Sequence, residues 1–284
     1  MACGKRRDAK GKAMRIASAL LIVSGLAVLI AVNAADIYSQ NIAERHIQSF
    51  TSVFNDDANP ERLRLKEQAQ KYNEHLAGKE VDVELMAYED QLYYQHEPMM
   101  SYIEIPKISV KQAIYHGTAE TELMAGIGHL ATSSLPIGGE TSHCVLLGHS
   151  GMRNARMFDD LAKLERGDEF VVWTLNEPYA YEVYMKETVT PEEAEMRIGL
   201  SPGCDEVTLI TCTPYGVNTH RLLVHARRCE YDAERVGDVS IDAYVNDRNL
   251  PLLVATAAMA AVAVSVALTR MARRKRAQAR RADV

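Results

Sequence analysis

The sequence lacks the residues and motifs that build cross-linked, metal-bound or nucleotide-bound proteins. Five cysteines in 284 residues are too few for the disulfide framework of a small secreted domain. Histidine and carboxylate residues do not recur at metal-ligand spacing, and neither an EF-hand loop nor an HExxH motif occurs. No glycine-rich phosphate loop, internal repeat or low-complexity tract is present. The sequence therefore predicts no metal ion and no other cofactor.

Positive charge is scarce between residues 16 and 268. The two ends, 1–15 and 269–284, hold 13 of the 32 basic residues but only two of the 38 acidic ones. The remaining chain has 19 basic and 36 acidic residues, a formal charge of −17. A domain this acidic is a poor partner for nucleic acid or for an anionic membrane surface. We therefore predict no nucleic-acid binding.

Two uncharged apolar runs lie near the ends of the chain. Residues 16–35 read IASALLIVSGLAVLIAVNAA, and residues 250–268 read LPLLVATAAMAAVAVSVAL. About 20 apolar residues cross a bilayer as a helix, so both runs are predicted to be transmembrane helices. A cleavable signal peptide is the alternative for the first run, and a buried core helix for the second. The basic ends predict that the chain lies in the cell membrane with both termini cytoplasmic and residues 36–249 extracellular.

The segment outside the membrane divides into a helical part and a strand-rich part. Apolar residues recur at near-helical spacing between Ile37 and Phe54, and a second helix is predicted over 60–77 with Asn59 as its N-cap. Residues 79–98 have no clear period. The predicted organisation is a cytoplasmic basic tail (1–15), a transmembrane helix or signal anchor (16–35), an extracellular helical segment (36–98), a strand-rich domain (99–231), a linker (232–249), a second transmembrane helix (250–268) and a cytoplasmic basic tail (269–284).

Short apolar runs separated by turn residues begin at Tyr102. They read YIEIP, VKQAIYHG, HCVLLGH, EFVVWTL, YAYEVYMKETV, EVTLITC and RLLVHARR. Many short strands at this spacing predict a mainly β fold, either a closed barrel or a sandwich. Residues 123–127 and 157–164 are predicted to form short helical insertions.

One cysteine stands at the end of a predicted strand, beside a polar loop. Cys212 closes the run EVTLITC, the loop TPYGVNTH follows, and Arg221 opens the next strand. If the two strands form a hairpin, Cys212 and Arg221 lie opposite one another. An arginine close to the sulfur would favour the reactive thiolate and could stabilise an oxyanion. We therefore predict that Cys212 is a nucleophile, although most strand cysteines are buried apolar residues and most arginines form surface salt bridges.

His149 is the third candidate, because it too ends a strand and enters a loop. An imidazole there could act as general acid toward a leaving amine. The other histidines in the strand-rich part are interpreted as structural, groove-lining or loop-shaping: His116, His129, His143, His220 and His225.

Four blocks of sequence resemble the sortases, the membrane-anchored cysteine transpeptidases of Gram-positive surfaces. They read YIEIPKISVKQAIYHGT, GIGHLATSSLPIGGETSHCVLLGHSG, MFDDLAKLERGDEF and TLITCTPYGVNTHRLLV, in the family's order over roughly residues 100–228. The last block and the second apolar span are most similar to class C, the pilin-polymerising subgroup. The resemblance implies a closed eight-stranded β-barrel.

The resemblance also implies chemistry. Cys212 corresponds to the nucleophile, His149 to the acid/base and Arg221 to the oxyanion stabiliser. The implied substrate is a surface or pilin protein with an LPXTG-like sorting signal, cleaved between Thr and Gly through a thioester. The acceptor amine comes from a pilin lysine or from a peptidoglycan precursor. A plain cysteine peptidase and a non-catalytic assembly factor are the alternatives.

Further residues are weaker candidates. The candidate groove residues are Thr211, Thr213, Pro214, Asn218, Ser133 and Ser134, although turn formation explains several of them equally well. Class C sortases often have an Asp-Pro-aromatic lid. Here the region reads MAYEDQL, so the candidate lid is Tyr88, Glu89 and Asp90 without that triplet. Cys204 and Cys229 would face each other in an unbulged hairpin and form a candidate disulfide, while Cys144 is predicted to lie in the core.

Overall fold

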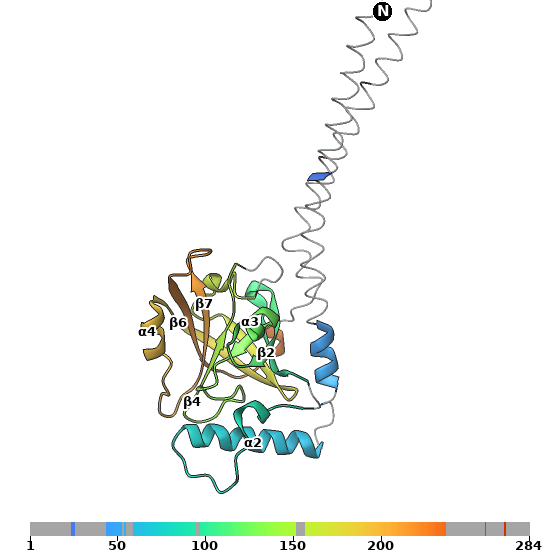
Figure 1. The fold of residues 1–284 in the computed structure, drawn as a ribbon, viewed down its shortest axis with the longest axis vertical. Helices are drawn as coiled ribbons and strands as arrows, with labels where there is room; N and C mark the ends of the chain where they lie inside the picture. The colour runs from blue at the N-terminus through green and yellow to red at the C-terminus, as the bar shows by residue number, and fades with distance from the viewer. Residues whose placement is uncertain are drawn as a thin grey trace, which may run out of the picture. The chain divides into compact units, whose positions relative to one another are not determined.

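A closed β-barrel dominates the part of the chain that the structure describes. The computed structural model describes residues 24–25, 44–52, 54, 59–94, 97–151, 157–236, 259 and 270. The chain divides into two compact units, and the barrel belongs to the one at Tyr38–Ile241. Figure 1 shows its strands and short helices.

Eight strands close the barrel in the order β1-β2-β3-β4-β7-β8-β6-β5. Neighbouring strands are antiparallel except for the parallel pairs β2–β3 and β4–β7. The strands are β1 (Met99–Ile105), β2 (Val110–His116), β3 (Ile127–His129), β4 (Ser142–Leu147), β5 (Glu169–Thr174), β6 (Glu177–Val189), β7 (Asp205–Thr213) and β8 (His220–Arg228). The prediction of a mainly β, eight-stranded barrel is confirmed.

The described helices are short, apart from one. They are α2 (Pro60–Leu76), α3 (Glu120–Ala125), α4 (Pro191–Met196) and α5 (Ala233–Val236), with 3₁₀ turns η1 (Tyr88–Asp90), η2 (Pro106–Ile108) and η3 (Leu161–Lys163). Residues 44–52 are also helical.

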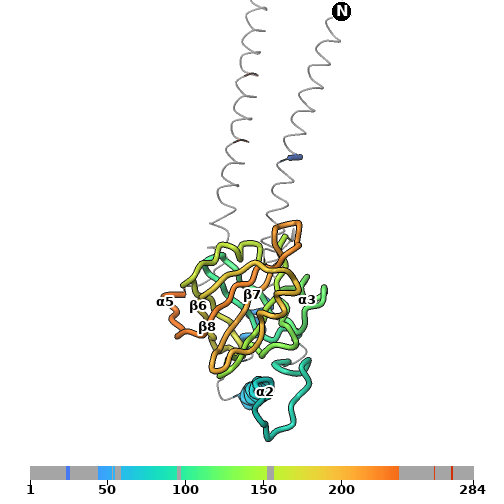
Figure 2. Tube along the Cα trace, turned by 90° about the vertical axis from the view of Figure 1, so that its left-hand side faces the viewer, coloured from blue at the N-terminus to red at the C-terminus, as the bar shows by residue number. Residues whose placement is uncertain are grey.

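Helix α2 begins and ends where the sequence predicts. The Asn59 side chain accepts hydrogen bonds from the Glu61 and Arg62 backbone, and Gly78 follows the helix in the left-handed region. Its buried Asn73 bonds to Leu135 at both amide atoms. Figures 1 and 2 both show α2 at one end of the barrel and the turn between β7 and β8 at the other.

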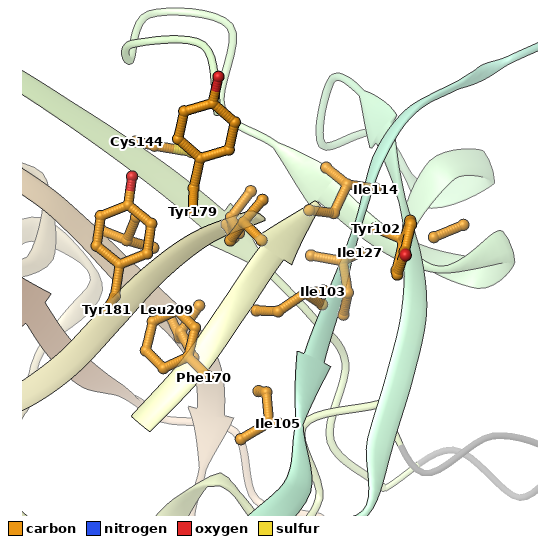
Figure 3. Close-up of a cluster of buried hydrophobic side chains, with 14 of the residues drawn as sticks. Tyr102, Ile103, Ile105, Ile114, Ile127, Cys144, Phe170, Tyr179, Tyr181 and Leu209 are labelled. Carbon is orange, nitrogen blue, oxygen red and sulfur yellow. The ribbon is translucent and has the colours of Figure 1, made fainter. Parts of the chain in front are cut away.

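The barrel interior is a continuous apolar core. Ile103, Ile127, Phe170 and Leu209 are each at most 1% exposed and converge from four different strands (Figure 3). Cys144 also points into this core, as predicted, and burial raises the pKa of its thiol well above the ordinary value. A buried thiol held in its protonated form is a poor nucleophile, so Cys144 does not compete with Cys212.

Two predicted helical insertions differ from the structure. Residues 123–127 were predicted to be helical, but α3 ends at Ala125 and Ile127 already begins β3. A three-residue strand is too short to show a period of two. Residues 157–164 form turns with only η3 helical. Helix α4 was not predicted, although Thr190 and Glu193 form a capping box that could be read from the sequence.

The predicted transmembrane spans lie outside the described residues, apart from Ser24, Gly25 and Met259. In the described parts of the chain, no helix is long and apolar enough to span a bilayer. The two spans therefore stay predictions.

Buried His129 predicts a pH-dependent stability. Its Nε2 bonds to the Ser134 carbonyl and its Nδ1 to the Tyr88 hydroxyl, and burial lowers its pKa from 6.5 to about 4. A depressed histidine pKa favours the neutral folded form, so this stability is complete above pH 6.5 and is lost as the pH falls toward 4. The loss amounts to roughly 3 kcal/mol at about 1.4 kcal/mol per pH unit.

Urea unfolding at pH 7 and at pH 4.5 tests this expectation. The wild type should lose roughly 2–3 kcal/mol more than His129→Asn between the two pH values. His46→Asn, at an exposed histidine, is the matched control and should follow the wild type. Equal losses in the wild type and His129→Asn would contradict the account.

Candidate active site

Cys212 and Arg221 are directly opposed across the hairpin formed by β7 and β8. The antiparallel register pairs Cys212 with Arg221, as the hairpin prediction requires, and Thr211 with Leu222. Directly opposed side chains share one face of the sheet, with Cβ atoms roughly 4.5–5.5 Å apart. Both residues are partly exposed at the turn end of the hairpin, where a substrate can reach them.

This pair lies on the outer face of the barrel. Side chains alternate along a strand and Leu209 points into the main core, so Ile210 and Cys212, one and three residues later, share the opposite face. Ile210 packs with Val145, Val189, Ala194 and Leu223 in a second apolar cluster. That cluster lies under α4, and it forms an apolar floor next to the cysteine and the arginine.

His149 reaches the same place from β4. Strand β4 runs parallel to β7 with Leu147 opposite Ile210, so two residues further along each chain His149 comes level with Cys212. The Gly148 amide continues the ladder by donating to the Ile210 carbonyl at 3.0 Å. The three predicted catalytic residues therefore come from three strand ends that adjoin one another.

An acidic side chain, that of Glu120, lies close to the His149 imidazole. Its Nε2 is 3.7 Å from Oε1 of Glu120 in α3, too far for a hydrogen bond but within ion-pair range when the ring is protonated. This nitrogen is shielded from solvent and has no hydrogen-bond partner within the described part of the chain. Sequence reasoning missed Glu120, because nothing local connects it to a histidine 29 residues later in the chain.

The turn between β7 and β8 orients Arg221. Its Nη1 donates to the carbonyls of Asn218 at 3.2 Å and His220 at 3.1 Å. Asn218 has a φ of 60°, a left-handed conformation that asparagine tolerates better than most residues. Asn218 is therefore explained by turn formation and by its bond to the arginine. Thr213 is partly exposed and Pro214 is exposed beside Cys212, and their groove role stays a prediction.

Three of the competing histidines cannot reach a substrate in this structure. His129, His143 and His225 are all at most 3% exposed and hydrogen-bonded inside the protein. Their interpretation as structural residues agrees with these contacts. His220 is exposed and pairs with Thr213 beside Cys212, so its loop-shaping role stays a prediction.

Ser133, Ser134 and Thr211 do not line an open groove. Their exposed fractions are 7%, 0% and 4%. The hydroxyls of Ser133 and Ser134 accept from the amides of Val145 and His143, on the half of β4 remote from His149. The Thr211 hydroxyl donates to the Gly148 carbonyl. The prediction failed because strand alternation turns Thr211 inward, and because the loop at 133–134 folds back onto β4.

The candidate lid lies away from Cys212. The Tyr88 hydroxyl bonds to His129 and receives the Gly117 amide, which ties it to β2 and β3. His129 is level with Leu146 and hence with Leu209, three residues before Cys212, or roughly 10 Å along the strand. Figures 1 and 2 place this segment at the α2 end. Tyr88, Glu89 and Asp90 therefore do not cover the sulfur in this structure.

The predicted disulfide is wrong, because Cys204 and Cys229 are free thiols. The ladder between β7 and β8 begins at the pair Glu206 and Arg227. Beyond it, the Cys204 carbonyl accepts from the Ser142 amide at 2.9 Å, while the Cys229 amide donates to the Ala180 carbonyl at 3.0 Å. The two backbones turn to different neighbouring strands. Extending the hairpin register beyond the paired residues could not predict this.

Comparison with known proteins identifies the barrel. Residues 103–229 match the family model for the sortase domain. A sortase A of Bacillus anthracis is 29% identical over 122 residues, which cover 43% of this chain and 56% of that protein. The chain thus spans little more than half the length of this curated relative.

Solved structures give fuller coverage. A crystal structure of sortase C1 from Streptococcus agalactiae is 39% identical, with a TM-score of 0.61 over 66% of this chain and 100% of that one. The sortase C1 of GBS Pilus Island 1 is 34% identical, with a TM-score of 0.61 over 66% of this chain and 99% of that one. With the fold, the motif order and these similarities in agreement, the chain belongs to the sortase family of cysteine transpeptidases.

Proposed function

We propose that the chain is a membrane-anchored transpeptidase that cleaves an LPXTG-like sorting signal between Thr and Gly and transfers the acyl group to a pilin lysine. The direct opposition of Cys212 and Arg221, with His149 level with the cysteine, is the observation that carries this proposal. It brings a nucleophile, an oxyanion donor and a proton carrier to one edge of a rigid sheet.

Each residue has a defined role in acylation. The Cys212 thiolate attacks the Thr carbonyl carbon, and the carbonyl oxygen becomes an oxyanion that the Arg221 guanidinium stabilises. As the tetrahedral intermediate collapses, the C–N bond to Gly breaks and the His149 imidazolium gives its proton to the leaving amine. The product is a thioester at Cys212 and a neutral imidazole. Among the residues that the structure describes, Nε2 of His149 has no hydrogen-bond partner, which fits a proton donor whose partner arrives with the substrate.

The second half-reaction reverses these roles. An amine attacks the thioester carbonyl, neutral His149 accepts its proton, and the thiolate leaves as the amide bond forms. A pilin lysine is our proposed amine because the two similar structures named above are of sortase C1, one of them of a pilus island. A peptidoglycan precursor amine is the alternative acceptor. Loss of high-mass ladders from surface proteins in a deletion strain supports the lysine, whereas loss of wall-anchored monomers supports the precursor.

The location of this chemistry is also part of the proposal. Residues 16–35 and 250–268 would anchor the chain in the cell membrane, with both termini in the cytoplasm and the barrel outside. Cysteine labelling by a membrane-impermeant reagent in intact cells tests this: labelling of Cys212 but not of Cys3 is expected, and the opposite pattern would overturn the orientation.

Transpeptidation predicts a change of product when an amine is added. With an LPXTG peptide alone, water slowly resolves the thioester and gives the free acid. With a lysine-containing pilin peptide in excess, we expect most of the acyl group to appear as an amide, measured by liquid chromatography and mass spectrometry. An Nε-acetylated version of the peptide is the matched control. Formation of only the free acid in both mixtures would indicate a plain cysteine peptidase.

A further inference from the structure

The strand ends that carry His149 and Cys212 are joined by two hydroxyl groups. The Thr211 hydroxyl donates to the Gly148 carbonyl at 2.8 Å, and the Ser150 hydroxyl donates to the Cys212 carbonyl at 2.7 Å. Each bond runs from a side chain on one strand end to the backbone of the other. The residues before and after His149 are therefore both tied to the segment at Thr211 and Cys212.

These bonds begin where the backbone ladder stops. The final backbone bond between the two strand ends runs from the Gly148 amide to the Ile210 carbonyl. The His149 carbonyl instead accepts from the Phe158 amide, so the chain turns away from β7 at this point. Without further bonds, the two strand ends would be free to separate just where the imidazole and the sulfur must cooperate.

The anchor for the first bond is rigid. A Cβ atom at Gly148 would lie 2.6 Å from Phe158 Cδ2 and 2.7 Å from Ile127 Cδ1, so the backbone there is pressed against the core. Thr211 itself is buried, which shields its bond from competing water. The two hydroxyl bonds, which we call the clamp, thus connect the loop after β4 to a fixed point.

We propose that Ser150 and Thr211 are positioning residues that set the separation of the His149 imidazole from the Cys212 sulfur. This inference rests on the proposed function for its chemistry, because a general acid must reach the leaving amine while the sulfur is bonded to the same carbon. A displacement of about 1 Å in such an arrangement can slow a reaction roughly 100-fold. Both hydroxyls bond to backbone carbonyls and not to the His149 ring or the Cys212 sulfur, so we expect kcat to change more than KM.

Isosteric removal of each hydroxyl tests the proposal. Ser150→Ala and Thr211→Val should each lower kcat for peptide cleavage roughly tenfold while KM changes less than about twofold. Ser150→Thr and Thr211→Ser retain a hydroxyl and should recover most of the rate. The double variant should be slower than either single variant but faster than independent effects predict, since both bonds close one gap.

A second readout separates positioning from loss of fold and needs no peptide. The rate of Cys212 alkylation by iodoacetamide, followed over a range of pH, should be lower in Ser150→Ala and Thr211→Val than in the wild type, because a His149 ring held farther from the sulfur assists its reaction less. Thr174→Val is the matched control: its buried hydroxyl donates to the Pro136 carbonyl at 2.5 Å, far from the site. It should lose stability but keep the wild-type alkylation profile and kcat.

The outcomes are distinguishable. Wild-type kcat and alkylation profiles in both Ser150→Ala and Thr211→Val would overturn the proposed positioning role. Losses of kcat that match the unfolded fraction of each variant, as measured by circular dichroism, would overturn it too. If the wild type cleaves no sorting-signal peptide, the proposed function fails, but the alkylation profiles still decide whether the clamp couples His149 to Cys212.

Discussion

Replacing Cys212 with alanine is expected to reduce cleavage of an LPXTG peptide by roughly 10⁴-fold or more, because no thioester can form without the sulfur. The strand β7 should be unaffected, since Cys212 is partly exposed at its end and leaves no core cavity when shortened. Chromatographic measurement of the released Gly-containing fragment, with folding checked by circular dichroism, gives the result directly.

Cys204→Ala provides the matched control for this variant. Cys204 is also a free, partly exposed thiol, but it lies at the opposite end of β7. The variant Cys204→Ala should keep wild-type cleavage. In the wild type, alkylation of Cys204 should not depend on added peptide. Residual cleavage by Cys212→Ala above about one part in 100 would point to another nucleophile. Full function in cells would instead favour a non-catalytic assembly factor.

Replacing Arg221 with alanine is expected to lower kcat roughly 10²–10³-fold, the usual cost of losing an oxyanion donor. KM should change little, because the guanidinium acts on charge that develops only in the transition state. Arg221→Lys keeps the charge but loses the planar fork of donors, so we expect only partial recovery. Steady-state kinetics with a fluorogenic sorting-signal peptide separate kcat from KM.

Arg227→Ala is the matched control for the arginine. Arg227 lies on the same face of β8, six residues further along, where it pairs with Glu206 at 3.2 Å. It should retain wild-type kcat. Adding Arg221→Ala to Cys212→Ala should cause no further loss, because residues of one catalytic unit are not additive. A fully additive double variant, or a loss confined to KM, would assign Arg221 to substrate binding instead.

The barrel and its three central residues could be predicted because they depend on local pattern. Seven of the strands show the apolar runs and turn residues that mark strand boundaries. Helix α2 has both of its end signals. The opposition of Cys212 and Arg221 follows from hairpin symmetry alone, since the ladder between β7 and β8 has no bulge from Glu206 to Thr213.

The remainder depends on contacts between distant segments. Strand β3 is held by its neighbours β2 and β4, not by a pattern of its own. In the sequence, Thr211 is an ordinary strand residue and Ser150 an ordinary loop residue. Their bonds become visible only when β4 and β7 are placed side by side. The disulfide failed for the same reason: register arithmetic holds within a ladder, and Cys204 and Cys229 lie just outside it.

Trapping the acyl-enzyme tests the central claim most directly. The full-length chain is mixed with an LPXTG peptide, quenched in acid within seconds and digested, and its cysteine-containing peptides are weighed by mass spectrometry. We expect the peptide containing Cys212 to gain the mass of the LPXT acyl group, to lose it on treatment with hydroxylamine, and to remain unmodified in Cys212→Ala. Cleavage of the sorting signal without any adduct, or with the adduct on another residue, would contradict the account.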